Sequence, residues 1–209
     1  MKIAVINETS AADRNADILA ALDGLGHEVF NVGMRHNGEK PELTYIHTGF
    51  LGALLLNTGR VDFVVGGCGT GQGFLNSVMQ YPGVCCGHLM SPMDAWLFTQ
   101  INAGNCISLA LNQGYGWAGD INLRFLFEKL FGVESGGGFP AHRRESQQQS
   151  RLLLAEISRQ THRSLAEIVS LLPEAVVKPA LEYPGVMELL DCESIANLEL
   201  KHALAGRLK

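Results

Sequence analysis

The residues best suited to chemistry in this chain lie in a single glycine-rich turn. Residues 67–73 read Gly-Cys-Gly-Thr-Gly-Gln-Gly and follow an apolar run, so the turn is expected to join a strand to a helix. Alternating glycines let the backbone approach a ligand closely and direct several N–H groups toward one point. A thiol beside such donors suits removal of a carbon-bound proton, with the N–H groups stabilising the resulting enediolate. The turn therefore predicts Cys68 as a general base; the alternative is a small buried cysteine that only fills space.

Two familiar anion-binding motifs do not fit this turn. Counted from Gly69, the dinucleotide fingerprint needs its third glycine where the chain has Phe74. Counted from Gly67, that position is Gln72. A phosphate-binding P-loop needs a lysine, which the turn lacks. A nucleotide-binding module is therefore disfavoured, whereas the start of the following helix favours the thiolate form of Cys68.

Composition excludes several classes of function. The formal net charge is −5, so there is no basic field to hold nucleic acid. Hydrophobic residues make up 46% of the chain, enough for a sizeable core, but no apolar run is long enough to predict a membrane span. The first residues read as a buried strand rather than a secretory leader. Five cysteines without a CxxC pair predict reduced thiols in the cytoplasm, and scattered histidines predict no metal site and no other cofactor.

The elements that position the turn alternate between strands and helices, which predicts an α/β fold with a parallel sheet covered by helices. The expected strands are residues 2–7, 27–32, 61–66, 83–87 and 106–111. The expected helices are residues 16–25, 45–57, a helix opened by the turn, a helix from Pro92 to about residue 102, and residues 117–130.

The composition changes at residues 134–140, where Glu-Ser-Gly-Gly-Gly-Phe-Pro predicts a loop. No strand is expected beyond it. A long polar helix over residues 144–160 and a capping box of Ser164 with Glu167 predict a helical tail. We therefore divide the chain into an α/β domain over residues 1–145 and a helical extension over residues 146–209, which we expect to wrap a neighbouring subunit.

Several separated motifs resemble the family of ribose-5-phosphate isomerase B and the galactose-6-phosphate isomerase subunits. They are the Cys-Gly-Thr-Gly-x-Gly turn at 68–73, the opening Lys-Ile-Ala at 2–4, Leu-Gly-His-Glu-Val at 25–29, the pair Asn102 and Asn105, and the glycine-rich loop with its arginine at 136–143. The resemblance covers about residues 1–145. It implies a Rossmann-like five-stranded sheet and metal-free proton transfer between C1 and C2 of a sugar. It also implies a homodimer, or a tetramer made of two such dimers, with sites shared between subunits.

The resemblance assigns roles to residues of this chain. Cys68 is implied as the base, with Gly69, Thr70, Gly71 and Gly73 forming the enediolate hole. The implied substrate-binding residues are Glu8, Tyr45, His47, Asn102 and Arg143. Tyr45 and His47 lie about 200° apart on a helix, so only one of them is expected to reach the site. His88, after the fourth strand, either lines the cleft or is a hydrogen-bonded structural histidine.

The departures from the family pattern predict a changed substrate. The family's ring-opening histidine falls at Ile101, and two phosphate-gripping arginines fall at Asn112 and Phe139. An apolar side chain cannot carry a proton to a ring oxygen, and one guanidinium grips phosphate less well than three. A linear sugar with one carboxylate, such as a 4-deoxy-5-keto-hexuronate, fits these losses better than a sugar phosphate. The alternative is a non-catalytic or partner-dependent subunit on the same fold.

Overall fold

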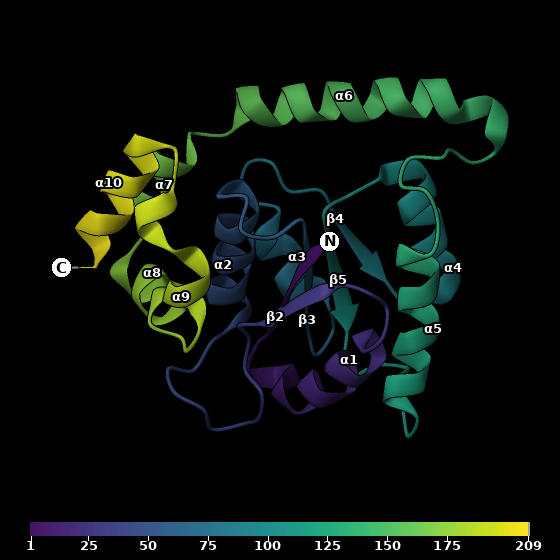
Figure 1. Cartoon of the computed structure of the whole chain (residues 1–209), viewed down its shortest axis with the longest axis horizontal. Helices are drawn as coiled ribbons and strands as arrows, with labels where there is room; N and C mark the ends of the chain where they lie inside the picture. The colour runs from purple at the N-terminus through teal and green to yellow at the C-terminus, as the bar shows by residue number, and fades with distance from the viewer. Residues whose placement is uncertain (209) are drawn as a thin grey trace.

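The computed structural model describes residues 1–208 and contains one five-stranded, all-parallel sheet with the strand order β2-β1-β3-β5-β4 (Figure 1). The strands are β1 (Lys2–Asn7), β2 (Glu28–Asn31), β3 (Phe63–Cys68), β4 (Cys86–Leu89) and β5 (Cys106–Ala110). The predicted Rossmann-like α/β fold is confirmed. Within residues 1–208, no helix is both long and apolar enough to cross a lipid bilayer.

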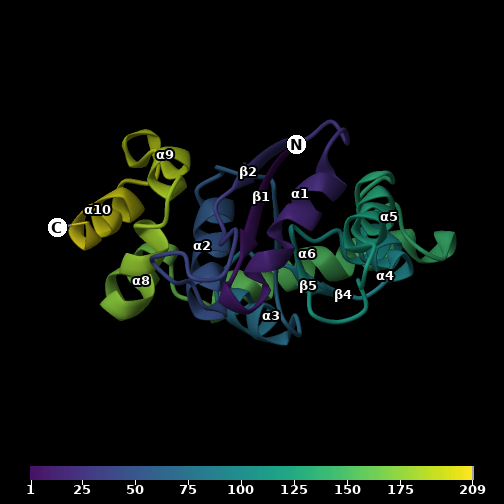
Figure 2. The same cartoon turned by 90° about the horizontal axis from the view of Figure 1, so that it is seen from below.

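Both faces of the sheet are buried, because alternate residues of each strand enter separate cores. Ile3 and Val5 face the helices α1 (Asn15–Leu22), α4 (Pro92–Leu97) and α5 (Gly119–Phe131). Ala4 and Ile6 face α2 (Tyr45–Asn57) and α3 (Gln72–Val78). Figure 2 shows α2 on one side of the sheet and α1, α4 and α5 on the other. This three-layer arrangement is why the central strands are almost entirely apolar.

The glycines at the end of β3 allow very close packing. A Cβ on Gly66 would lie 2.2 Å from the ring of Phe74 on α3, and one on Gly67 would lie 2.4 Å from the carbonyl oxygen of Leu109. The strand β3 continues through both glycines and ends at Cys68. The apolar pattern had predicted that it ends at residue 66. Glycine carries no hydrophobic signal, so the pattern ended the strand too early.

Other boundaries also differ from the prediction. A 3-10 helix, η1 (Thr9–Arg14), follows β1 where the sequence predicted no helix; Glu8 caps it by accepting the backbone N–H of Ser10. α1 ends at Leu22, earlier than predicted. After α4 the chain forms a π-helix, η2 (Phe98–Asn102), where one continuous helix was expected. β4 starts at Cys86, because the residues before it form a turn.

The C-terminal residues form helices only, as expected. After η3 (Ala141–Arg143), the long helix α6 (Arg144–Thr161) has no buried residue and crosses from the α4/α5 side of the molecule to the other helices of the tail (Figure 1). These are α7 (Leu165–Leu171), α8 (Glu174–Leu181), α9 (Val186–Leu190) and α10 (Leu198–Arg207), with a 3-10 turn, η4 (Cys192–Ser194), between the last two.

Helices α7–α10 share a core with α2 of the same chain. Val177 and Leu181 of α8 belong to the same apolar cluster as Leu51 and Leu54 of α2. Tyr183 also donates its hydroxyl to Glu39 at 2.6 Å. In this structure helices α7–α10 are therefore packed on their own α/β domain. The expectation that the tail wraps a neighbouring subunit concerns a second chain and stays a prediction.

Candidate active site at the carboxyl edge of the sheet

The glycine-rich turn lies where three parallel strands end side by side. β3 lies between β1 and β5, with Asn7 of β1 opposite Gly67 and Ala110 of β5 opposite Cys68. Polar residues just beyond the ends of β1 and β5, such as Glu8 and Asn112, are therefore brought to the turn. This edge of an open parallel sheet is where ligands are commonly bound.

Cys68 is almost buried, with 5% of its surface exposed, and its Sγ lies 3.9 Å from the hydroxyl oxygen of Thr70. The Thr70 hydroxyl accepts the backbone N–H of Gln72 at 3.3 Å. Because an acceptor lone pair is used in this way, the hydroxyl proton is free to point at the sulfur. The Thr70 hydroxyl is therefore placed to donate a hydrogen bond to the Cys68 sulfur.

The backbone of the turn is held from the side of β4 and β5. Gly71 has a φ of +74°, a conformation that favours glycine, and a Cβ there would lie 2.5 Å from His88 Nε2. Ser108 of β5 donates its hydroxyl to the Gly71 carbonyl. His88 Nε2 lies 3.1 Å from the Thr70 carbonyl, which can only accept, so Nε2 carries the proton. His88 therefore both lines the turn and fixes it.

The opposite side of the turn is held by a second set of hydrogen bonds. Gly69 donates its N–H to Ser10 Oγ at 2.9 Å, and its carbonyl accepts the N–H of Asn112 at 3.0 Å. Ser10 in turn donates its hydroxyl to Glu8, whose side chain is buried. Burial raises the pKa of the Glu8 carboxyl, while its bonds to Ser10 oppose that rise. The Gly69 N–H is thus already engaged, and donates to an enediolate only if it leaves Ser10.

Of the two candidates at the start of α2, Tyr45 lies at the turn. A Cβ on Gly73 would lie 2.9 Å from the Tyr45 ring, so the ring covers the start of α3. His47 points elsewhere: its Nδ1 accepts the backbone N–H of Thr44 at 2.9 Å, and its Nε2 lies 2.9 Å from the Ala175 carbonyl of α8. Both ring nitrogens of His47 are therefore engaged within the chain, one in capping α2 and one with the tail.

Asn102 and Arg143 lie at the other end of the sheet. Asn102 is exposed at the end of η2, just before β5, whose first residue is in register with Val64 near the start of β3. The loop before Arg143 is tied to the same π-helix, since Gly136 and Gly138 donate their N–H groups to carbonyls of η2 at 2.9 Å. Within one chain, these two residues are therefore not brought together with Cys68.

Sequence comparison identifies the family of the chain. The profile of the Ribose/Galactose Isomerase family matches residues 3–135, well over half of the chain. The chain belongs to this family. The predicted class of enzyme, an aldose–ketose isomerase, is confirmed by this match and by the isomerases among the solved structures that resemble the chain.

Two solved structures are similar to this isomerase over nearly its whole length. A 4-deoxy-L-threo-5-hexosulose-uronate ketol-isomerase complexed with a tartrate is 39% identical with a TM-score of 0.92, covering 100% of this chain and 99% of its own. A ribose-5-phosphate isomerase from Vibrio parahaemolyticus is 41% identical with a TM-score of 0.91, covering 98% of each chain. Comparison with curated protein sequences finds no significant match.

More distant relatives share the fold. Ribose-5-phosphate isomerase B of Clostridium thermocellum is 20% identical with a TM-score of 0.65, covering 78% of this isomerase and 100% of its own chain. It leaves part of this chain unmatched, whereas the two structures about 40% identical to this isomerase match nearly all of it, the helical tail included.

Sequence reasoning missed two residues of this isomerase that touch the turn. Ser10 and Asn112 each hydrogen-bond to Gly69, and Asn112 Nδ2 also donates to the Ser10 carbonyl at 2.8 Å. The signal that could have found them is their position, since each lies within three residues of the end of a strand that flanks β3. The sequence pattern marks Asn112 only as the place of a missing arginine.

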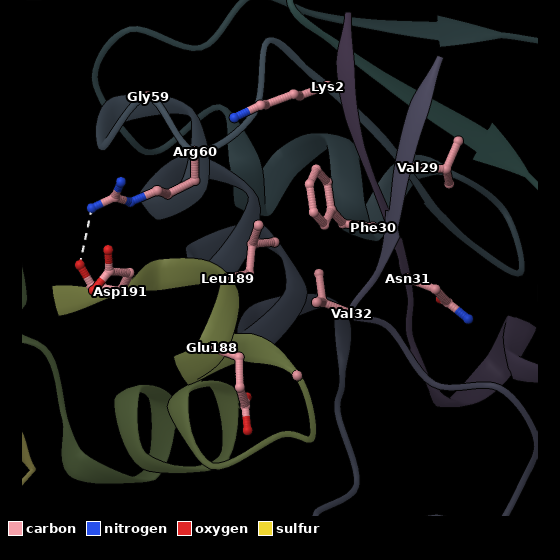
Figure 3. Close-up of a pocket in the computed structure, with 11 residues that line it drawn as sticks. Lys2, Val29, Phe30, Asn31, Val32, Gly59, Arg60, Glu188, Leu189 and Asp191 are labelled. Carbon is pink, nitrogen blue, oxygen red and sulfur yellow. Dashed lines mark hydrogen bonds between the residues drawn. The ribbon is translucent and has the colours of Figure 1, made fainter. Parts of the chain in front are cut away.

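A cavity of about 570 Å³ lies away from the turn, between the edge strand β2 and α9 of the tail (Figure 3). Arg60 on its wall donates to the Asp191 carbonyl at 3.0 Å and to Ser194 Oγ at 2.6 Å, which makes it a link between the domain and the tail. In residues 1–208, no three His, Cys, Asp or Glu side chains converge in a way that could hold a metal ion.

Proposed function

We propose that this isomerase interconverts the aldose and ketose forms of an open-chain keto-uronate, such as a 4-deoxy-5-keto-hexuronate, with Cys68 as the base. The observation that carries the choice of substrate is the chemistry of the groups bonded to the turn. Ser10, Gln72, His88 and Asn112 supply hydroxyl, amide and imidazole groups, and none of them is a lysine or an arginine. Such groups suit hydroxyl and carbonyl oxygens, whereas a phosphate dianion needs cationic donors.

In the proposed reaction, the Cys68 thiolate removes the proton from C2 of the aldose, and the electron pair moves into an enediolate. The N–H groups of Thr70 and Gly73 form no hydrogen bond within residues 1–208, so they are available to the developing oxyanion. The Glu8 carboxyl accepts a substrate hydroxyl. The Cys68 thiol then returns its proton to C1, which regenerates the thiolate, while the hydroxyl proton of O2 passes to O1, so that C2 becomes the carbonyl carbon of the ketose.

The chain has Ile101 where the family has its ring-opening histidine, and this difference is consistent with the same open-chain substrate. A side chain such as Ile101 cannot protonate a ring oxygen, but an open-chain sugar has no ring to open. The 39% identical neighbour acts on a 5-hexosulose-uronate and was crystallised with tartrate, itself a hydroxy-carboxylate. A single carboxylate requires only one guanidinium, and we assign that role to Arg143.

Arg143 and Asn102 reach the proposed site only if a second copy of the chain supplies them. They lie at the amino edge of the sheet, while Cys68 lies at its carboxyl edge. We therefore propose a homodimer, or a tetramer made of two such dimers, in which each site combines the carboxyl edge of one subunit with the amino edge of the other. No nucleic acid, membrane, metal or other cofactor is required by this scheme.

We place the enzyme in the cytoplasm. All five cysteines fall within residues 1–208, and each is a free thiol there. Cys68 must remain reduced to act as a base, which a reducing compartment ensures.

The test is exchange of the C2 proton with solvent deuterium, followed by NMR over a panel of keto-uronates and aldose phosphates. We expect exchange with the keto-uronate and a loss of at least about 1,000-fold in Cys68→Ala, as is usual when a catalytic base is removed. Cys192→Ala, which changes a partly exposed tail thiol, is the matched control and should keep full activity.

Other outcomes discriminate between the candidates. Exchange with ribose 5-phosphate alone would favour the second candidate substrate, which is supported by the 41% identical neighbour. No exchange with any compound would favour a non-catalytic or partner-dependent subunit, and Cys68 would then be a core residue.

A further inference from the structure

We propose that Ser10 is a positioning residue of this active site: it holds Gly69 of the turn and one oxygen of Glu8, so that the other Glu8 oxygen is left to bind the substrate. The proposal rests on the isomerase function proposed above. It concerns a residue outside the glycine-rich turn, on a 3-10 helix that the sequence did not predict.

The contacts around Ser10 form a closed ring between the ends of three strands. Its hydroxyl oxygen accepts the N–H of Gly69 at 2.9 Å, and its carbonyl accepts Asn112 Nδ2 at 2.8 Å. Asn112 closes the ring by donating its own N–H to the Gly69 carbonyl at 3.0 Å. Ser10 and Asn112 therefore fix both polar backbone groups of the residue that lies between Cys68 and Thr70.

The space around Gly69 supports this reading. A Cβ there would lie 3.0 Å from Asn112 Nδ2 and 3.2 Å from Ser10 Oγ, so the two side chains close tightly over the backbone. A rigid backbone at this position fixes the direction in which Cys68 and Thr70 point. Small displacements of a catalytic group cost large factors in rate, so such support matters for catalysis.

Only one of the two oxygens of the Glu8 carboxylate accepts a hydrogen bond within residues 1–208. Its Oε1 accepts both the N–H of Ser10, at 3.0 Å, and the Ser10 hydroxyl, whereas its Oε2 forms no hydrogen bond within residues 1–208. Only 3% of Glu8 is exposed. Oε2 is not among the buried side-chain atoms that lack a partner, so it is the carboxylate oxygen that reaches the surface, and the geometry points to it as the acceptor of a substrate hydroxyl.

Ser10 also controls the charge of Glu8. Burial raises the pKa of the Glu8 carboxyl, the two hydrogen bonds from Ser10 lower it, and the negative Glu42, before α2, raises it further. The other titratable groups of this edge are Cys68, at the end of the neighbouring strand, and His88 and Tyr45, which contact the turn. Loss of the Ser10 hydroxyl should therefore raise the pKa of Glu8, so that the carboxyl is protonated at higher pH.

The experiment compares Ser10→Ala with Ser10→Thr, which keeps the hydroxyl. Ser10 is exposed, so neither change disturbs the core. We expect kcat of the alanine variant to fall roughly 10- to 100-fold with a much smaller change in KM, because the substitution misplaces a catalytic group and removes no group that binds the substrate. The threonine variant should restore most of this activity. Ser91→Ala, which removes the side-chain cap of α4, is the control for loss of a hydroxyl elsewhere.

A second readout does not depend on turnover. The pKa of Glu8 can be measured by titrating carboxyl carbon-13 NMR signals, with the Glu8 signal identified by its absence in Glu8→Gln. We expect an upward shift in Ser10→Ala, wild-type behaviour in Ser10→Thr, and no shift in Ser91→Ala. An unchanged kcat or an unchanged Glu8 pKa in Ser10→Ala overturns the proposal. If the wild-type enzyme is active and Cys68→Ala is not, such a failure concerns Ser10 alone and leaves the proposed function standing.

Discussion

The two edges of the sheet carry different parts of the proposed chemistry and are built in different ways. At the carboxyl edge, side chains from the ends of β1, β4 and β5 hydrogen-bond to the turn that follows β3. At the amino edge, Asn102 and Arg143 are exposed, and within residues 1–208 the Arg143 side chain bonds only to Ser146, three residues away. The carboxyl edge is thus organised around the turn beside Cys68, and the amino edge presents polar side chains to the outside.

The comparison shows that one chain does not bring the proposed base, Cys68, together with the proposed anion-binding residue, Arg143. Parallel strands place all strand ends of one kind at one edge, so a residue before β5 cannot meet a residue after β3 in the same chain. Two copies joined with opposite edges together would give two complete sites. The predictions below test this division, starting with the largest expected effect.

Mixing two inactive variants tests whether the edges come from different subunits. We expect Cys68→Ala to lose the activity and Arg143→Ala to lose most of it through a higher KM. If the variants are unfolded together and refolded at equal amounts, random pairing in a dimer should restore about a quarter of the wild-type activity, because half of the dimers have one intact site. Measurement of isomerisation rates before and after mixing checks this.

A matched control uses the double variant Cys68→Ala with Arg143→Ala, mixed with either single variant. No intact site can form in those mixtures, so they should stay inactive. No recovery in the mixture of Cys68→Ala with Arg143→Ala, or full activity of Arg143→Ala alone, would contradict the shared site and leave Arg143 as a surface residue.

Gly73→Ala tests how tightly the carboxyl edge is packed. The added Cβ would lie 2.9 Å from the Tyr45 ring, so either the ring or the start of α3 must shift. We expect kcat/KM to fall about tenfold, in line with a small displacement of catalytic groups. Kinetic measurement at several substrate concentrations is the check.

The comparison for that variant is Gly206→Ala in the tail helix α10, where an added Cβ has no atom within 4 Å. That change should raise the free energy of unfolding by roughly 0.5–1 kcal/mol, because alanine favours a helix over glycine, and should leave kcat/KM unchanged. Equal kinetic effects of the two substitutions would show that the turn is not specially constrained.

Arg60→Ala tests whether the tail supports the fold or the chemistry. The variant loses the hydrogen bonds to the Asp191 carbonyl and to Ser194, so we expect a loss of about 1–3 kcal/mol in the free energy of unfolding. Because these bonds are far from the turn, kcat should not change. Urea unfolding together with a kinetic assay measures both quantities.

Arg159→Ala on α6 is the control, since its ion pair with Glu156 is exposed and should contribute within about 0.5 kcal/mol. If Arg60→Ala lowered kcat as well as the free energy of unfolding, the contact between the tail and the domain would contribute to catalysis.

Much of the fold could be predicted because its signals are local. β1 and α2 have the predicted bounds, and the Ser164–Glu167 capping box is present, since apolar period and capping depend on near neighbours in the chain. The predicted boundaries were wrong where the sequence has no apolar period or helix pattern. β3 continues through two glycines that carry no hydrophobic pattern, and η1 is a short 3-10 helix held by the Glu8 cap.

The residues of the candidate site also divide into those that the sequence could predict and those that it could not. The glycine-rich turn is visible in the sequence, because Cys68 and its alternating glycines form one continuous segment. Ser10 and Asn112 are not, because their meeting at Gly69 requires β1 and β5 to be the two neighbours of β3. His47 illustrates the same limit, since the Ala175 carbonyl that it contacts is 128 residues away.

The sequence by itself therefore determined the layers, the parallel sheet, the candidate thiol and the glycine-rich turn beside it. Only the tertiary structure decided which side chains hold that nest and which residues lie at the far edge of the sheet. The physical reason is that strand and helix patterns are set by contacts a few residues apart. Contacts between strand ends depend instead on the order of the strands, which the apolar pattern does not encode.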